Sequence, residues 1–208
     1  MTCLLFLGLV QIPKTLPPVD QGPQDALFVA YRNNLLRALK NQDVMGIKAR
    51  IADDVVYSVG DPDAKGEAKM FSSFRKQGGL AHLYAELEAV LKLGGHFTQS
   101  GFWAPYTYQG WPEDLDPFEN AYGVVPRAKL YDLSGKRVVG TLENFGLIKV
   151  YSGPFAGELK AGWRLYIDPK SGQTVAAPNK EIRTNADYRA LFEKRNGVYQ
   201  LTFFASGD

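Results

Sequence analysis

Aromatic side chains gather in one part of this sequence, where their types and spacing could support ligand binding. Residues 97–118 hold seven of them, although an aromatic content of 12% predicts between two and three. Glycines and prolines separate these rings, which argues against a single regular buried element. Flat rings in such a segment can bind the faces of sugars or the edges of prolines. We therefore predict a ligand-binding surface made of Trp103, Tyr106, Tyr108 and Trp111. The alternative is that the same rings pack two parts of the chain together.

Titratable and nucleophilic side chains show no spacing that is typical of catalysis. His82 stands four residues before Glu86 on a predicted helix, which favours a solvated pair. His96 is expected to face solvent at the start of a strand, and a role as general base is the alternative. Ser73 and Lys76 fit the S-x-x-K pattern of penicillin-binding enzymes, but the S-D-N pattern that belongs with it is absent. We name no catalytic residue and favour a protein that is not an enzyme, with catalysis left open.

Metal-ligating residues are too few for the common protein metal sites. One cysteine and two histidines exclude Cys₄, Cys₂His₂ and His₃ zinc sites, and one cysteine cannot form an internal disulfide. Four acids lie together at Glu113, Asp114, Asp116 and Glu119. Prolines flank them and no EF-hand spacing is present, so we expect a solvated turn, with a calcium site or a catalytic carboxylate pair as alternatives. We predict no metal and no cofactor.

Charge and composition exclude several classes of protein. The chain has 208 residues and a formal charge of only +2, which provides no broad basic surface for nucleic acid. Its hydrophobic content of 45% and charged content of 22% are those of a folded protein. No apolar run approaches the ~20 residues of a transmembrane helix. We therefore expect no nucleic-acid partner and no transmembrane segment.

The N-terminus is predicted to be an export signal. Residues 4–10 form an apolar run of the length found in a signal-peptide core, although a basic stretch before it and a small-residue cleavage site after it are missing. Prolines at 13, 17, 18 and 23 then indicate an extended linker. We assign residues 1–24 to a possible signal segment and linker. The expected location is periplasmic or otherwise exported, or cytoplasmic if the run is not a signal.

Helical periodicity dominates the first half of the remaining chain. Leu27, Tyr31, Leu35 and Leu39 recur every four residues behind a plausible N-cap at Asp25. Further helices are expected at 44–51, 65–76 and 80–91, and a strand at 55–59. Residues 25–121 are thus predicted to be a helical lobe that ends in the aromatic-rich loop.

Short strands with turn residues between them follow. They are expected at 122–130, 137–142, 147–151, 163–167 and 174–176, and their spacing near ten residues is typical of a small barrel over residues 122–183. At the C-terminus, alternating residues on both sides of Asn196-Gly197 predict a hairpin. A lone hairpin is marginal in water, so residues 184–208 should return to the first lobe.

Two resemblances agree with this division. Pro126 and Arg127, the segment Val-Val-Gly-Thr-Leu at 138–142 and Gly162-Trp163 resemble a bacterial SH3-like (SH3b) domain. The segments LLRALKNQDVMGIKARIADDVVYSVG and YRALFEKRNGVYQLTFFASGD resemble uncharacterised exported bacterial proteins with the α+β cone of nuclear-transport-factor-like or cystatin-like folds. These resemblances imply an α+β fold, in which an SH3-like barrel is inserted between the helical lobe and its C-terminal hairpin.

The resemblances also imply a function. SH3-like domains of this kind suggest a non-enzymatic binding module of the cell envelope, whose ligand would be peptidoglycan or a peptide held by the aromatic segment. A second hypothesis is a small-molecule or weakly catalytic pocket in the cone, lined by Tyr57 or His96. A third is a structural subunit or inhibitor of an envelope enzyme.

Overall fold

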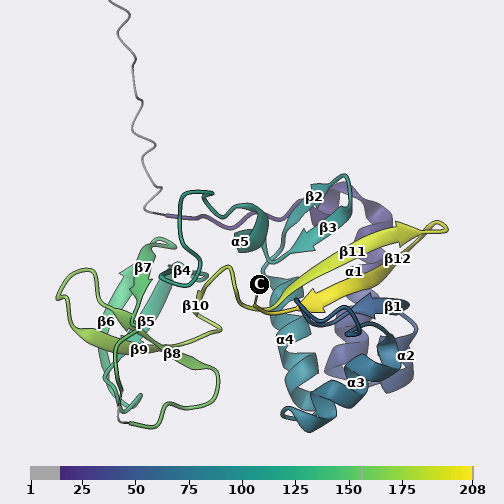
Figure 1. Ribbon diagram of the computed structural model, residues 1–208. Helices are drawn as coiled ribbons and strands as arrows, with labels where there is room; N and C mark the ends of the chain where they lie inside the picture. Colours follow the sequence, from purple (N-terminus) through teal and green to yellow (C-terminus); the bar gives the residue numbers. More distant parts are fainter. Residues whose placement is uncertain (1–14, 156, 208) are drawn as a thin grey trace, which may run out of the picture.

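The chain folds around two β-sheets, each of which has a hydrophobic core of its own. The computed structural model describes residues 15–155 and 157–207, so the predicted signal run at 4–10 lies outside the described residues. The helical lobe combines four helices with a five-stranded sheet, and the β lobe is built on a seven-stranded sheet (Figure 1). The protein is therefore an α+β protein, as predicted.

The helices begin and end where the sequence provides capping residues. The helix α1 (Ala26–Lys40) starts behind Asp25, whose side chain accepts hydrogen bonds from the backbone N–H groups of Leu27 and Phe28, which confirms the predicted N-cap. A short 3₁₀ helix, η1 (Gly22–Gln24), precedes it. The other helices are α2 (Val44–Lys48), α3 (Glu67–Lys76) and α4 (Leu80–Lys92). Gly94, with φ of +74°, follows α4 and lets the chain turn towards the sheet.

The five-stranded sheet joins the first part of the chain to its last part. Its strand order is β1 (Ile51–Val56), β12 (Val198–Ala205), β11 (Arg189–Arg195), β3 (Gly101–Ala104) and β2 (His96–Thr98). The predicted strand at 55–59 begins earlier, at Ile51, because β1 pairs in parallel with β12 from that residue. The C-terminal hairpin thus occupies the middle of the sheet, and its turn at Asn196-Gly197 has the positive φ values that this pair of residues favours.

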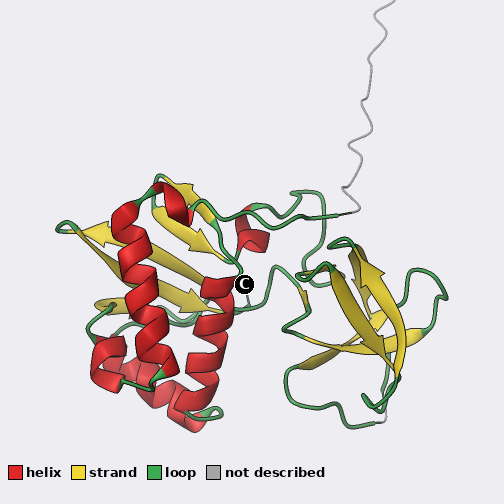
Figure 2. Cartoon of the chain, turned by 180° about the vertical axis from the view of Figure 1, so that it is seen from behind, coloured by secondary structure: helices red, strands yellow, loops and turns green. Residues whose placement is uncertain are grey.

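The helices cover only one face of this sheet. Buried residues of α1, α3 and α4 pack with inward-facing residues of the strands, such as Phe102, Phe192 and Phe204. Figure 2 shows the helices in front of the strands, and Figure 1 shows the opposite face without a helical layer. Because side chains alternate between the faces of a strand, Trp103, Leu191 and Phe203 lie on the open face.

The β lobe is an open, curved sheet rather than the closed barrel expected from the sequence. Its order is β10 (Ile182–Arg183), β4 (Asn120–Gly123), β7 (Leu147–Val150), β8 (Trp163–Ile167), β9 (Thr174–Pro178), β5 (Arg127–Tyr131) and β6 (Val138–Glu143). Within the described residues β10 does not pair with β6, so the sheet has two free edges. The predicted strand at 122–130 is two strands, because Pro126 cannot donate a ladder hydrogen bond.

Ion pairs connect the lobes. The Arg183 guanidinium lies 3.7 Å from the Glu86 carboxylate on α4, and Arg164 on β8 contacts Asp187 at 3.0 Å in the segment leading to β11. Thr15 forms a bridge to Gly146, so this part of the linker lies along the β lobe, whereas Gln21 donates from its backbone N–H to the Gly95 carbonyl of the helical lobe. No helix in the described part of the chain is long and apolar enough to cross a membrane.

Candidate functional site

Trp103 and Tyr108 meet on the open face of the five-stranded sheet. Trp103 is on β3, and Tyr108 is on α5 (Tyr106–Gln109), the short helix that follows this strand. Their ring centroids are 4.8 Å apart, and the Trp103 ring contacts Phe203 of β12 edge-on at 5.6 Å. All three rings are partly exposed. Two of the four rings predicted to bind ligand therefore do belong to one exposed surface.

A buried arginine completes this cluster. The guanidinium carbon of Arg189 lies 5.0 Å from the centre of the Tyr108 ring and 5.8 Å from that of Phe203. These are distances at which a cation is attracted to an aromatic face. Arg189 is only 8% exposed, and its Nε has no hydrogen-bond partner among the described residues. We call Trp103, Tyr108, Arg189 and Phe203 the open-face cluster.

A hollow of about 520 Å³ adjoins the open-face cluster along the sheet. Its floor includes Trp103, Leu191 and Phe203, and its rim is charged. At the rim, Arg195 contacts Asp54 at 2.6 Å and Glu193 at 2.8 Å. The hydrogen bond from Arg195 holds the pKa of the Asp54 carboxyl below its usual range. The surface thus combines apolar rings with paired charges at its edge.

The other two predicted residues lie elsewhere. Tyr106 is 1% exposed, and its hydroxyl donates a hydrogen bond to the Leu16 carbonyl at 3.3 Å; burial raises its pKa to about 12. Trp111 donates from Nε1 to the Leu115 carbonyl at 2.7 Å, and its ring packs edge-on against Tyr122 of the β lobe at 5.3 Å. The predicted four-residue surface is therefore not assembled: Tyr106 is enclosed, and Trp111 packs against the β lobe.

The structure adds Arg189, Leu191 and Phe203, which sequence reasoning had not considered. They belong to the C-terminal hairpin, and none stands in an aromatic-rich segment. The signal that could have identified them is the alternation along the hairpin, since it places residues 189, 191 and 203 on one face once the register is known.

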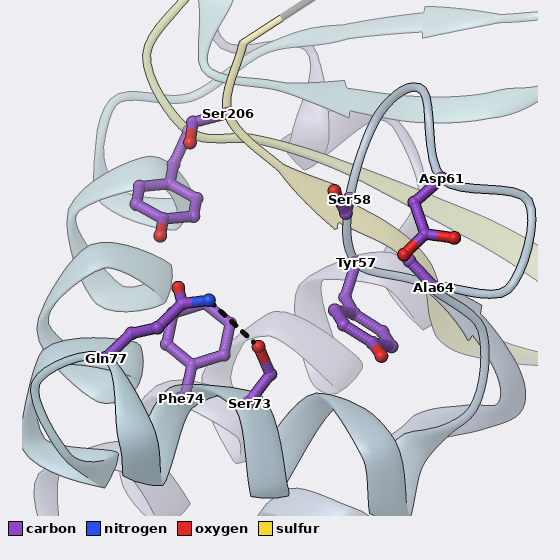
Figure 3. Close-up of a pocket in the computed structure, with 9 residues that line it drawn as sticks. Tyr57, Ser58, Asp61, Ala64, Ser73, Phe74, Gln77 and Ser206 are labelled. Carbon is purple, nitrogen blue, oxygen red and sulfur yellow. Dashed lines mark hydrogen bonds between the residues drawn. The ribbon is translucent and has the colours of Figure 1, made fainter.

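A polar cavity of about 260 Å³ lies at another edge of the helical lobe, between α3 and the end of the hairpin. Figure 3 shows Ser206 and Gln77 on one side of it, and Tyr57, Ser58 and Asp61 on the other. The Gln77 amide donates a hydrogen bond to the Ser73 hydroxyl at 3.2 Å. Tyr57 therefore lines a polar cavity in this lobe, and His96 is not among the residues that line it.

The two histidines differ from what the sequence suggested. Glu86 contacts Arg183 rather than His82, and the His82 ring lies about 6 Å from the rings of Phe74 and Tyr188, so the predicted solvated pair is wrong. His96 does start a strand, but its Nε2 is enclosed and has no partner among the described residues. This burial lowers the pKa of His96.

The acidic group forms a turn. The Asp116 carboxylate accepts hydrogen bonds from the backbone N–H groups of Phe118 and Glu119. In residues 15–155 and 157–207, no three His, Cys, Asp or Glu residues come together as a group that could hold a metal ion.

The chain has no match in three comparisons with known proteins. No protein-family model, no curated protein and no solved structure matches it.

Proposed function

We propose that this protein is a non-enzymatic binding protein of the bacterial cell envelope, and that its ligand, peptidoglycan or a peptide, lies on the open face of the five-stranded sheet. The observation that carries this proposal is the open-face cluster beside a hollow of about 520 Å³. Partly exposed aromatic rings beside a hollow are suited to stacking on sugars and on apolar side chains.

The cluster is held in a fixed position by the sheet. β3 lies between β2 and β11, where Trp103 pairs with His96 on one side and Leu191 on the other. Phe203 stands on β12, the next strand. A ring that is already ordered loses little conformational entropy when a ligand binds, so such a surface is suited to recognition.

The proposal extends to the fold. The curved, open seven-stranded sheet has a core of its own, which includes Leu130, Ile148 and Tyr166, and this separate core supports the proposal of an SH3-like unit. The helical lobe, with helices on one face of a sheet completed by the C-terminal hairpin, fits the cone-like plan. Export to the envelope belongs to the same proposal and is motivated by the apolar run at 4–10.

Co-sedimentation with purified sacculi tests this function. The double variant Trp103→Ala/Tyr108→Ala should bind at least tenfold more weakly than the parent, about 1.4 kcal/mol, because aromatic anchors dominate such surfaces. The matched control is Phe118→Ala, which removes a ring that is 56% exposed but outside the cluster. All proteins should first be shown to be folded by circular dichroism. Failure of the parent to bind, or equal binding of the double variant, would contradict the proposal.

A second candidate function is binding of a small polar molecule in the cavity of Figure 3. Its favouring observation is the set of hydroxyl, amide and carboxylate groups from Tyr57, Ser73, Gln77 and Asp61 around an apolar ring, Phe74. A ligand that binds only the folded state raises the melting temperature. A hit from a screen of sugars and amino compounds should lose its thermal shift in Gln77→Ala, and a hit that keeps it would place the ligand elsewhere.

A further inference from the structure

Arg189 carries a positive charge that no described side chain neutralises. A guanidinium stays protonated in proteins at any ordinary pH, so burial cannot remove this charge. Arg189 is 8% exposed, and its Nε is enclosed without an acceptor. Its guanidinium lies over the faces of Tyr108 and Phe203, which attract a cation but accept no conventional hydrogen bond.

The nearby acids are already paired with other cations. On the open face, Asp54 and Glu193 both contact Arg195, and Lys65 lies on the same rim. Two residues before Arg189, Asp187 contacts Arg164. The two acids and two bases of the rim balance one another in charge, so Arg189, beside them on the same face, is left without an opposite charge among the described residues.

We propose that Arg189 is the anchor for a single carboxylate of the ligand. This inference rests on the proposed function and specifies its ligand class: a carboxylate next to an apolar group or a sugar ring. A carboxylate can accept two parallel hydrogen bonds from a guanidinium. Only Nε is enclosed, so the terminal nitrogens are the donors left to meet it.

The local charge favours a monoanion over a phosphate dianion. One unmatched positive charge balances one carboxylate, whereas the second charge of a dianion would find no surplus cation at the rim, where the two acids and two bases already balance one another. The Trp103 ring lies 4.8 Å from the Tyr108 ring, which itself contacts Arg189, so a group attached to the carboxylate would reach the Trp103 ring. Peptide stems of peptidoglycan and the free C-terminus of a peptide both present this chemistry.

The first test compares two soluble muropeptide probes by calorimetry: a disaccharide–tetrapeptide, and the same molecule with its carboxyl groups methyl-esterified. The parent should bind the acid at least tenfold more tightly than the ester. Arg189→Met, which keeps an unbranched side chain between the rings, should lose this difference. Arg37→Met is the control, because Arg37 is an exposed arginine of α1 and should leave both affinities unchanged. The free tetrapeptide, as a third probe, shows whether the sugar is needed.

The thermal stability of Arg189→Met gives an independent readout. Removal of an unmatched buried charge should leave the melting temperature of the ligand-free protein unchanged or raise it, whereas loss of a purely structural arginine should lower it. Equal affinity of the parent for acid and ester, or a tenfold preference for the acid that persists in Arg189→Met, overturns the inference.

A separate titration distinguishes failure of this inference from failure of the proposed function. Sodium acetate added to ¹⁵N-labelled parent should shift the Arg189 Nε–H signal saturably, with the signal assigned from its absence in Arg189→Met. Absence of a shift overturns the carboxylate anchor even if sacculi bind through Trp103 and Tyr108. A saturable shift supports the anchor even if no muropeptide binds, and the error then lies in the envelope ligand.

Discussion

At the scale of single residues, the Asp25 carboxylate joins the first helix to the central hairpin. Oδ1 caps α1, and Oδ2 accepts a hydrogen bond of 2.9 Å from the Tyr199 hydroxyl on β12. The Tyr199 hydroxyl is the largest cause that holds the pKa of Asp25 below its usual range. One side chain thus both starts the helix and fixes its end against the sheet.

Tyr199→Phe is expected to lower the free energy of unfolding by about 1 kcal/mol at pH 7, because it removes this hydrogen bond from a buried ring. A carboxyl whose pKa is lowered on folding stabilises the protein above its unfolded pKa, near 3.9, and this contribution is lost as the pH falls through the folded value. The difference in the free energy of unfolding between the parent and Tyr199→Phe should therefore be smaller at pH 3 than at pH 7. Urea unfolding at both pH values measures it.

Tyr151→Phe is the control for this prediction. The Tyr151 hydroxyl donates to the Pro154 carbonyl, which does not titrate. Any decrease in the free energy of unfolding that comes from losing this hydrogen bond should therefore be the same at pH 7 and pH 3. If Tyr199→Phe lowers the free energy of unfolding equally at pH 7 and pH 3, the hydrogen bond to Asp25 is not what stabilises the protein through Tyr199.

At the scale of elements, the hairpin β11–β12 is the centre of the helical lobe. β11 pairs with β3, and β12 pairs with β1, so the last strands of the chain connect strands from its first half. Phe192, which is fully buried on β11, contacts the rings of Phe28 and Tyr31 on α1 at 5.8 and 5.7 Å. The hairpin therefore holds the helices on the sheet.

Phe192→Ala should lower the free energy of unfolding by about 3–5 kcal/mol, because the substitution leaves a cavity between α1 and the sheet. Phe118→Ala, at a ring that is 56% exposed, should change it by less than about 0.5 kcal/mol. Chemical denaturation of both variants checks the difference. If both variants lower the free energy of unfolding by a similarly small amount, the hairpin is not packed against α1 as described.

Several of these elements could be predicted from the sequence because their signals are local. The four-residue repeat from Leu27 to Leu39 and the turn Asn196-Gly197 each specify an element without reference to the rest of the chain, and both predictions are confirmed. The start of β1 at Ile51 depends on pairing with β12, about 150 residues away, which no local pattern reveals. The open edge of the seven-stranded sheet is likewise a property of strand pairing.

The candidate site was predictable to the same extent. Trp103 and Tyr108 could be proposed because they lie close together in an aromatic-rich segment, and the structure places their rings in contact. Tyr106 shares that segment, but the start of α5 points its ring into the interior, where its exposure is 1%. Arg189 could not be found, because its place beside Tyr108 depends on the pairing of β11 with β3.

At the scale of the whole molecule, a buried arginine lies where the lobes meet. Arg183, on β10, is 2% exposed; its guanidinium contacts the Glu86 carboxylate at 3.7 Å and donates to the Tyr188 carbonyl at 3.3 Å. β10 pairs with β4 of the β lobe, while Glu86 belongs to α4. The pair therefore connects one lobe to the other.

Glu86→Ala should lower the free energy of unfolding by about 1.5–3 kcal/mol, because it leaves the Arg183 charge buried without its carboxylate. Glu88→Ala is the matched control on the same helix: its partner is Lys92, one turn away on the surface, and the expected loss is about 0.3–0.5 kcal/mol. Thermal and urea unfolding of the full chain measure both. Equal losses would contradict a connecting role for Arg183 and Glu86.

The open face as ligand surface is the central claim, and the indole signals of the three tryptophans test it most directly. Trp103 lies in the open-face cluster, Trp111 packs against Tyr122 of the β lobe, and Trp163 lies on the β lobe against Tyr131. In a ¹H–¹⁵N spectrum titrated with soluble disaccharide–tetrapeptide, the Trp103 indole N–H should shift saturably while those of Trp111 and Trp163 stay in place. A shift of the Trp163 signal alone would place the ligand on the β lobe and contradict the account.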